Sequence, residues 1–289
     1  MRVLMCPPDY IRIDEEINDW MDRKNQPDPR VARLQWQKLM EVYTHLGAEL
    51  WFIDPDPYLQ DMCFAANFAW CRGNKVILAN FAHSVRMPEK QYVQLWFNRH
   101  RQKMLNVSVH ELPTHIRFEG QGDVVTVDTS DGPLVLMGYG QGRTDYEAAP
   151  YLADIHNMPS DRIIPMRLVN SKFYHLDMAC NYIAPQNLFV YFPDAFDSAG
   201  KRIIESFPVI RYAVSEEDAL RFTCNGVFMQ DNNRKTIYVA TNPTDAFASK
   251  LQEYDIFTHK VDVSEVGKNG GSARCLTLFL PEESTFPEK

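Results

Sequence analysis

Apolar residues recur with helical spacing in five separate stretches of the chain. In the first stretch, Arg30–Leu46, the residues near one helical face are Val31, Leu34, Leu39, Val42 and Leu46. The other helices are expected after Pro88 (with Tyr92, Leu95 and Trp96 as its apolar side), over Asp145–His156, over Asp197–Ser206, and after Asn242. Asn242 is predicted to cap the last helix, which Pro243 begins. Successive helices start roughly fifty residues apart, a period typical of repeated supersecondary units.

Short runs rich in Val, Ile, Leu and aromatic residues lie between these helices and predict buried or half-buried strands. The predicted strands are Leu50–Ile53, Lys75–Phe81, Val124–Val127, Leu134–Met137, Ile163–Val169, Leu188–Phe192, Val209–Val214, Thr236–Ala240 and Leu276–Leu280. Units of strands plus one helix fit two architectures equally well: a closed, propeller-like α/β ring and a doubly wound α/β sheet. No Gly/Ser/Pro-rich linker divides the chain, so a single domain spanning residues 1–289 is expected.

The charge balance narrows the range of partners. Thirty basic residues stand against 38 acidic ones, for a net charge of −8, and no Lys/Arg block is present. Such a chain repels nucleic acid and anionic lipid. No apolar run approaches the roughly 20 residues that span a bilayer, and the opening residues lack the order of a secretory signal. We therefore expect a cytoplasmic protein that binds neither nucleic acid nor membranes.

The cysteines favour free thiols over disulfides or metal sites. They are Cys6, Cys63, Cys71, Cys180, Cys224 and Cys275. None forms a CxxC pair, and no Cys/His cluster has the spacing of a structural zinc site. In a long chain without a secretory signal, free cysteines usually behave as small buried hydrophobic residues. The sequence thus predicts neither a metal nor an organic cofactor.

Cys275 is the cysteine best placed for chemistry. It follows the adjacent glycines Gly270 and Gly271 at the predicted change from loop to strand. Adjacent glycines allow the backbone to approach a ligand closely, and a thiol at the start of a rigid strand can be presented to a pocket. A structural cysteine at the start of a buried strand is the simpler alternative.

Three further stretches carry polar residues suited to catalysis or binding. His175 and Asp177 are two residues apart in a predicted strand and so share a face, where a carboxylate could orient an imidazole for acid–base chemistry. Glu119 and Asp123 flank a Gly-x-Gly turn and could bind a cation. Arg143 lies in the glycine-rich turn after Gly138, and its planar fork suits a carboxylate. Each stretch, taken alone, is equally compatible with an ordinary surface pair or turn.

In their order along the chain, these stretches resemble the guanidino-group-modifying superfamily of arginine deiminases, dimethylargininases, amidinotransferases and arginine dihydrolases. The resemblance runs from Met5-Cys6-Pro7-Pro8-Asp9-Tyr10 to Arg274-Cys275-Leu276-Thr277-Leu278. Intermediate points of similarity are Gln35-Trp36, Asp61 to Asn67, Phe118 to Asp123, Gly138-Tyr139-Gly140, Phe173 to Asp177 and Cys224-Asn225. The opening and the Phe173 segment are most similar to the hydrolase domain of bacterial arginine dihydrolases. The resemblance implies a five-bladed, pseudo-symmetric α/β propeller, the pentein fold.

The same resemblance implies a role for each matched residue. Cys275 would attack the guanidinium carbon and form a covalent amidino-cysteine, and His175 would protonate the departing nitrogen and then activate water. Glu119 and Asp177 would hold the planar cation. The remaining implied substrate-binding residues are Asn18, Asp61, Asn67, Arg86, Asp123 and Arg143, of which the two arginines resemble residues that grip a substrate α-carboxylate. The family needs no cofactor and no metal, and its partner is a small guanidino compound.

Two departures from the wider superfamily bear on the substrate. Asn67 stands where deiminases and dimethylargininases carry an aspartate, and in this the chain resembles arginine dihydrolases. An asparagine holds a cation less tightly than a carboxylate does, which would allow a second hydrolytic round on the ureido product. In addition, the turn before Arg143 is one residue longer than usual, and Phe68 and Trp70 replace smaller residues. These changes leave the far end of the substrate undefined.

The expected function is therefore hydrolysis of arginine to ornithine, ammonia and carbon dioxide. Arginine deiminase, dimethylargininase and amidinotransferase activities remain alternatives within the same chemistry. A non-catalytic binding protein on this fold is an alternative of another class, because fold alone does not fix function. The sequence leaves open whether the chain forms a homo-oligomer.

Overall fold

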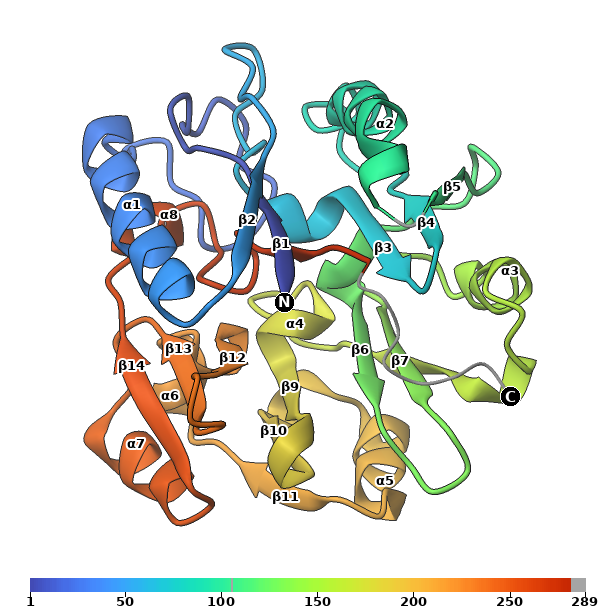
Figure 1. Cartoon of the computed structure of the whole chain (residues 1–289), viewed down its shortest axis with the longest axis vertical. Coiled ribbons are helices and arrows are strands. Elements are labelled where there is room, and N and C mark those ends of the chain that lie inside the picture. Colours follow the sequence, from blue (N-terminus) through green and yellow to red (C-terminus); the bar gives the residue numbers. More distant parts are fainter. Residues whose placement is uncertain (105, 282–289) are drawn as a thin grey trace.

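Five three-stranded sheets surround a common centre, and a helix lies on the outside of each (Figure 1). The computed structural model describes residues 1–104 and 106–281. In every sheet the inner strand is antiparallel to the middle strand, and the middle strand is parallel to the outer one. A parallel pair needs a crossover connection, and the helix supplies it. The arrangement confirms the five-bladed propeller and rules out the doubly wound sheet.

The blades correspond element by element: in four of them the chain runs inner strand, middle strand, helix and outer strand, and in the first blade the inner strand comes last in the chain. Each blade is given as its inner, middle and outer strand and the helix that connects the last two. The first two blades are β15 (Leu278–Phe279), β1 (Arg2–Met5) and β2 (Glu49–Phe52) with α1 (Pro29–His45), and β3 (Ala69–Arg72), β4 (Lys75–Leu78) and β5 (Ser108–His110) with α2 (Glu89–His100). The other three are β6 (Val124–Val127), β7 (Leu134–Tyr139) and β8 (Ile163–Arg167) with α3 (Ala148–Ile155); β9 (Cys180–Ile183), β10 (Leu188–Tyr191) and β11 (Ile210–Ala213) with α5 (Ser198–Ser206); and β12 (Val227–Gln230), β13 (Thr236–Ala240) and β14 (Ile256–Lys260) with α7 (Asp245–Gln252). Three short helices, α4 (Leu176–Ala179), α6 (Glu216–Leu220) and α8 (Ser264–Gly267), lie outside this pattern.

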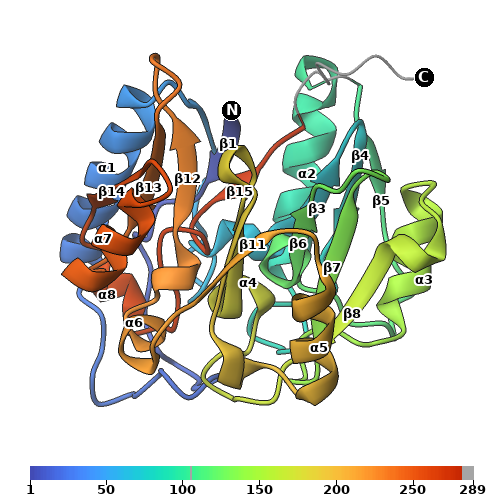
Figure 2. The same cartoon turned by 90° about the horizontal axis from the view of Figure 1, so that it is seen from below.

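The first blade closes the ring because it takes strands from distant parts of the chain. Its inner strand β15 pairs with β1, with Val3 opposite Phe279 and Leu4 opposite Leu278. Figure 2 shows the ring from the side, with α1 and α7 along one flank and α2 and α3 along the other. The apolar faces of these helices cover the sheets and contribute to three hydrophobic core clusters in the part of the chain that the structure describes. Within the described residues, no helix is long and apolar enough to cross a membrane.

The predicted helices exist, but their buried faces differ from those expected. In α1 the core face is formed by Ala32, Trp36, Leu39 and Tyr43, whereas Leu34 is 60% exposed. Val31 is also exposed, and in α2 Leu95 is 63% exposed while Trp96 is buried as predicted. The prediction followed aliphatic residues, but burying an aromatic ring removes more apolar surface from water, so the aromatic residues set the rotation of α1.

The predicted cap of the last helix is also wrong. Thr244, not Asn242, is the N-cap of α7, and its side chain accepts a hydrogen bond of 3.0 Å from the Phe247 backbone N–H. Asn242 has a φ of +38°, a left-handed conformation that asparagine tolerates better than most residues. The proline therefore lies in the approach to the helix and not in its first turn.

Each predicted strand contains or overlaps an observed one, but six strands were missed. The missed strands are β1, β3, β5, β9, β12 and β14, three of which are the inner strands of their blades. Four-residue strands such as Cys180–Ile183 contain a polar residue within a short apolar run, which is too little pattern to recognise. The inner strands matter most for function, because the turns that precede them build the site.

Candidate active site

A single helical turn precedes each inner strand of the propeller. These turns are Ala65–Phe68 before β3, Gly120–Asp123 before β6, α4 before β9, Thr223–Asn225 before β12, and the turn through Cys275 before β15. Neighbouring turns contact one another around the centre of the ring. Pseudo-symmetry therefore gathers side chains from five remote segments. In or beside these turns lie Asn67, Glu119, His175, Asp177, Asn225 and Cys275.

The Cys275 thiol is held by Asn225. The side-chain amide of Asn225 donates to Sγ at 3.1 Å and to the Asp177 carbonyl at 3.1 Å. Its Oδ1 accepts from the backbone N–H groups of Ser272 and Cys275, at 3.0 and 3.2 Å. One buried amide thus fixes both the sulfur and the turn that carries it. The resemblance included Cys224-Asn225 without a role, and spacing alone gave no signal for one.

Cys275 was expected at the start of a strand and the His175/Asp177 pair within one, and the structure contradicts both expectations. Cys275 does not begin a strand: it lies three residues before β15, in a turn in which the Leu276 N–H donates to the Ser272 carbonyl at 3.2 Å. His175 and Asp177 are not in a strand either, because His175 is the extended N-cap of α4 and Asp177 lies in its first turn. Both side chains nevertheless face the cluster, with different partners: Glu119 for His175 and Cys275 for Asp177.

Asp177 lies against the thiol, and among the described residues no basic side chain forms an ion pair with it. Its Oδ2 and Oδ1 are 3.6 and 3.8 Å from Cys275 Sγ, and both residues are buried. Burial, offset in part by the Arg274 cation, raises the pKa of Asp177 to about 7. Burial and the Asp177 carboxylate together raise the pKa of the Cys275 thiol well above its ordinary value. Without a further cation beside Asp177, Cys275 is therefore a thiol and not a thiolate.

In the His175–Glu119 pair both pKa values are lowered, whereas in the Asp177–Cys275 pair both are raised. Nε2 of His175 lies 2.7 Å from Oε2 of Glu119. Burial opposes ionisation of Glu119, but Arg143 and the hydrogen bond from His175 outweigh it and hold its pKa below the ordinary value. Burial lowers the pKa of His175 to about 4 in spite of this carboxylate. The imidazole is thus neutral near pH 7, with the Nε2 proton donated to Glu119 and Nδ1 free to accept a proton.

Both predicted arginines are buried and paired with carboxylates. Arg86 forms a two-pronged ion pair with Glu89, at 2.9 and 2.8 Å, and donates to Asn67 Oδ1 at 2.9 Å. Arg143 donates to Glu119 Oε2 at 3.2 Å and to the Ile17 carbonyl at 2.6 Å. Each arginine thus pairs with one of the protein's own acids, and the predicted grip on a substrate α-carboxylate stays a prediction.

Five of the predicted substrate-binding residues line a small polar cavity beside the thiol. It is lined by Ile17, Asn18, Met21, Asp61, Phe64, Asn67, Arg86, Arg143, Tyr174, Asn269 and Cys275, and it encloses about 10 Å³. This is roughly the space of one water molecule. Asp61 accepts from Gln60 at 2.8 Å and from Asn269 at 2.9 Å, and burial raises its pKa. The structure therefore has the pocket closed, and an arginine-sized ligand requires it to open.

Asn269 is a wall residue that the sequence did not indicate. Its side chain is fully buried, its amide N–H groups donate to Arg12 and Asp61, and its Oδ1 has no hydrogen-bond partner in the described structure. A buried acceptor without a partner beside a ligand cavity is available to a donor on the ligand. The only feature of the sequence that could have indicated Asn269 is its place as a polar residue directly before Gly270 and Gly271.

Asp123, like Glu119, His175 and Asp177, does not line this cavity. Its Oδ2 accepts from Thr144 at 2.6 Å and its Oδ1 from the Leu176 backbone at 3.1 Å. Burial raises its pKa well above the ordinary value. Asp123 thus joins the turn that bears Glu119 to the turn that bears Asp177, which is a supporting position.

The glycines of the two motifs make room for side chains of the pocket wall. A Cβ at Gly122 would lie 2.3 Å from Asn67 Nδ2, and one at Gly271 would lie 2.5 Å from the Phe64 ring. At Gly270, with φ of +89°, it would lie 2.7 Å from Asn18 Oδ1. In this structure the close approach is to side chains of the protein, and the predicted approach to a ligand stays a prediction.

All six cysteines are free, as predicted, and every one but the half-buried Cys71 is buried. Across residues 1–104 and 106–281, no group of three or more His, Cys, Asp or Glu residues is arranged to hold a metal ion.

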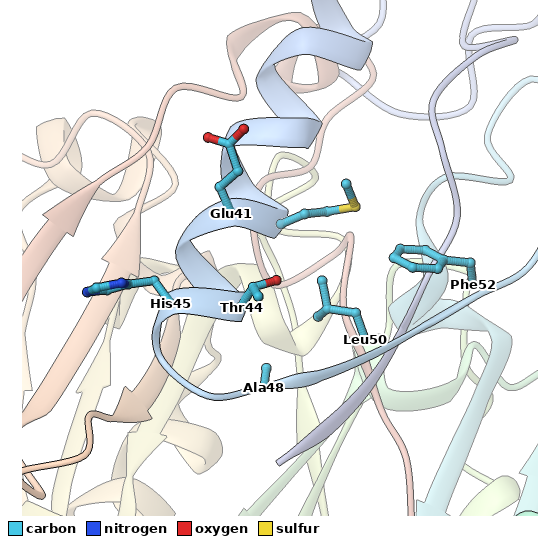
Figure 3. A pocket seen from close by; sticks show the side chains of 7 residues that line it. Glu41, Thr44, His45, Ala48, Leu50 and Phe52 are labelled. Carbon is cyan, nitrogen blue, oxygen red and sulfur yellow. The ribbon is translucent and has the colours of Figure 1, made fainter.

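Two larger hollows lie away from the thiol. One is a groove of about 700 Å³ between α1 and β2, lined by Met40, Glu41, Thr44, His45, Ala48, Leu50 and Phe52 (Figure 3). The other, of about 830 Å³, includes Trp20, Phe222 and Lys268. Neither contains Cys275 in its wall, whereas the small cavity does, so the cysteine singles out the small cavity.

The fold and this cluster together define a class, the guanidino-group-modifying enzymes with a cysteine nucleophile. Within it, the sequence profile of the family described as eukaryotic N,N dimethylarginine dimethylhydrolase matches residues 7–280. The chain belongs to this family.

Proteins similar to the chain in sequence include an arginine dihydrolase and a dimethylarginine dimethylaminohydrolase. The chain is 33% identical to the bifunctional arginine dihydrolase/ornithine cyclodeaminase AgrE of a Nostoc species, over 98% of this chain and 38% of that protein. It is 31% identical to the N(G),N(G)-dimethylarginine dimethylaminohydrolase of Mycobacterium tuberculosis, over 96% of this chain and 85% of that one. The chain thus spans less than two-fifths of the length of the bifunctional relative.

Solved structures of both kinds of enzyme also resemble the chain. The N-terminal domain of the cyanobacterial arginine dihydrolase ArgZ, in a cysteine-to-serine variant bound to substrate, superposes with a TM-score of 0.84 at 32% identity, over 97% of this chain and 98% of that one. A dimethylarginine dimethylaminohydrolase adduct gives a TM-score of 0.72 at 17% identity, over 96% of this chain and 98% of that one, and supports the fold alone.

Proposed function

We propose that the chain is one catalytic domain that hydrolyses the guanidine group of arginine to ornithine, ammonia and carbon dioxide through a covalent Cys275 intermediate. The observation that carries this proposal is the buried contact between the Asp177 carboxylate and the Cys275 thiol, which lines an enclosed cavity, together with the buried His175–Glu119 pair, which Arg143 joins to the wall of that cavity. A planar cation fits this setting, because Arg86 and Arg143 are paired with Glu89 and Glu119 and leave the charge of Asp177 to be balanced by a ligand.

Substrate binding activates the nucleophile in this mechanism. A guanidinium beside Asp177 and Cys275 lowers the pKa of both groups by Coulomb attraction, so the thiol ionises when the substrate arrives. The thiolate attacks the guanidinium carbon, and His175 takes up a proton and passes it to the departing nitrogen, which leaves as ammonia. The carbon now carries sulfur in place of that nitrogen.

Water then resolves the intermediate. Neutral His175 removes a proton from a water molecule, which attacks the amidino carbon and breaks its bond to sulfur, giving the ureido product citrulline. A second round at the same carbon releases ornithine, ammonia and carbon dioxide. Two water molecules are consumed and two ammonia molecules released for each arginine, so the atoms balance. Asn67 in the cavity wall supports the second round, because a neutral amide does not select against a neutral ureido group as a carboxylate would.

Hydrolysis of methylated arginine is the second candidate, and the family match favours it. The same thiol and histidine would then release methylamine or dimethylamine in place of ammonia. The two candidates differ in the leaving group, which must fit beside Phe64 and Asn67 in the cavity wall.

The test is incubation of the native protein and of Cys275→Ser with arginine, asymmetric dimethylarginine and citrulline, with every product identified by mass spectrometry. Ornithine from arginine, abolished in the variant, would support the dihydrolase proposal. Dimethylamine from dimethylarginine would support the second candidate, and citrulline as the sole end product would rule out the second round. Absence of turnover of all three compounds would contradict both proposals.

A further inference from the structure

Four basic residues lie close together beside the blade formed by β3, β4 and β5, and none of them lines the catalytic cavity: Arg72, Lys75, His110 and His156. We call them the basic cluster. Arg72 and Lys75 are Cα partners across the β3–β4 hairpin, and His110 is the partner of Ile77, two residues after Lys75. Residues that pair directly, or that are two apart in one strand, project from the same face of a sheet. The side chains of Arg72, Lys75 and His110 therefore share one face.

His156 reaches the same face from the neighbouring blade. It is the C-cap of α3, which packs against β4 (Figure 1), and the centroid of its ring lies 4.2 Å from that of Trp70. Trp70 is two residues before Arg72 in β3 and so shares its face. Burial, and then the charges of Arg72 and Lys75, lower the pKa of His156 to about 3. The imidazole is thus near both cations and neutral at pH 7.

Arg72 is a half-buried cation without a counter-ion. Its guanidinium forms no hydrogen bond or ion pair with any residue that the structure describes, and burial lowers its pKa. A charge that is partly removed from water without meeting an opposite charge costs free energy. Arg86 and Arg143, by contrast, each pair with a buried glutamate. Arg72 is therefore available to an anion from outside the chain.

The rest of the basic cluster also lacks an acidic partner among the described residues. Lys75 donates to the Ile155 carbonyl at the end of α3, and Nε2 of His110 lies 2.8 Å from the Ser108 hydroxyl. Nε2 of His156 is buried without a hydrogen-bond partner in the described structure, and the whole residue is 6% exposed. A buried polar atom without a partner indicates a ligand or water that completes the site. In a chain with a net charge of −8, the cluster is a local positive site.

We propose that the basic cluster binds a phosphate group, supplied by inorganic phosphate or by a phosphate monoester. A phosphate group carries a charge of about −1.5 to −2 at pH 7 and presents at least three acceptor oxygens. Its charge balances the two permanent cations, and its oxygens accept from the guanidinium fork, the ammonium group and the imidazole N–H groups. A carboxylate, with one charge and two oxygens, leaves part of the cluster unpaired. The site is distinct from the proposed catalytic function and does not depend on it.

The first test is isothermal calorimetry, with sodium phosphate titrated into the native protein at constant ionic strength. Binding should be saturable, and Arg72→Met should weaken it by about 10-fold or more, the size of one charged hydrogen bond. Arg221→Met is the matched control: Arg221 is partly exposed and paired with Glu217, and its replacement should leave the affinity for phosphate unchanged. Absence of saturable binding, or equal affinity in Arg72→Met and the native protein, would show that the proposal is wrong.

Thermal unfolding separates phosphate binding from a structural role of Arg72. Phosphate at 100 times its Kd should raise the Tm of the native protein by about 4 °C, because only the folded chain holds the site. In phosphate-free buffer, Arg72→Met should be at least as stable as the native protein, since methionine keeps much of the apolar stem and removes an unpaired charge. In saturating phosphate the variant should be the less stable of the two. An equal loss of stability in both buffers would make Arg72 purely structural and contradict the proposal.

A comparison of adenosine monophosphate, inorganic phosphate and adenosine identifies the source of the phosphate group. Tighter binding of the monophosphate than of inorganic phosphate would indicate a phosphate monoester, and equal or weaker binding would indicate the free anion. Adenosine should not compete with phosphate, and competition by it would count against recognition of the phosphate group. None of these measurements uses a guanidino substrate, so their outcome is independent of whether the chain hydrolyses arginine.

Discussion

Oδ2 of Asp177 lies 3.6 Å from Sγ of Cys275, with both side chains buried. A carboxylate in this position raises the pKa of the thiol, so the empty pocket holds a poor nucleophile. The same carboxylate attracts a cation, whose arrival reverses the effect. The pair therefore links the reactivity of Cys275 to the presence of a positively charged substrate, and four predictions follow from this cluster and its neighbours.

Asp177→Asn should stabilise the folded protein at pH 8. The pKa of Asp177 is raised from 3.8 to about 7, so the folded chain keeps a proton that the unfolded chain loses from about pH 4 upward. Stability is consequently lost as the pH rises from about 4 to 7, by up to about 4 kcal/mol. Asparagine cannot ionise and avoids this loss. Urea unfolding at pH 8 and pH 5 measures the difference, which should be largest at pH 8.

Glu119→Gln should change the stability of the folded protein in the opposite direction from Asp177→Asn. Arg143 and His175 hold the pKa of Glu119 below its ordinary value, so its ionised form stabilises the fold above pH 5 and its removal should lower stability at pH 8. An Asp177→Asn protein less stable than the native chain at pH 8 would contradict the electrostatic account of the site.

The pH profile of kcat/KM for arginine should have an acid limb near pH 7. Ionised Asp177 is needed to attract the guanidinium, and its pKa in the free protein is about 7, so activity rises as the pH increases through that value. Arg274 lowers the pKa of Asp177, and Arg274→Gln should shift the limb upward by about one pH unit. Arg274→Lys keeps the charge and serves as the control; an equal shift in both variants would show that the charge is not the cause.

Asn225→Ala should reduce kcat by about 100-fold, because small displacements of a nucleophile cost this much. It should also destabilise the fold by about 1–3 kcal/mol, since the Ser272 and Cys275 N–H groups lose their acceptor. Steady-state kinetics and thermal unfolding measure the two effects. Asn181→Ala is the matched control, because Asn181 holds the Cys224 and Gly226 carbonyls without touching Cys275. Comparable loss of kcat in both variants would assign Asn225 a purely structural role.

Asn67→Asp should change the product and not only the rate. Asn67 lines the cavity and accepts from Arg86, which an aspartate can also do. An added carboxylate favours the charged guanidinium over the neutral ureido group, so citrulline should accumulate at the expense of ornithine. Product ratios by mass spectrometry over a single-substrate time course measure the change. An unaltered ratio would show that Asn67 does not control the second round.

The sequence predicted the class of fold largely through a resemblance, not through its local patterns. The five helices and nine of the strands were visible as apolar runs, yet these left a ring and an open sheet equally plausible. Three of the five inner strands were invisible, because Ala69–Arg72, Cys180–Ile183 and Val227–Gln230 are four residues each with a polar member. The core face of α1 was misplaced for a related reason: which residues face inward depends on the sheet that the helix covers.

By itself, the sequence determined the chemical inventory: a cysteine after two glycines, a histidine two residues before an aspartate, and a glutamate before a Gly-x-Gly turn. Side-chain chemistry is local, so it can be recognised in one dimension. The residues that each side chain contacts are remote in sequence and cannot be recognised in this way. Only the closed ring brings Asn225 to Cys275, pairs His175 with Glu119 in place of Asp177, and lays Arg143 on the same carboxylate. Burial at the centre of that ring then sets the charge state of each group, because desolvation and neighbouring charges exist only in the folded chain.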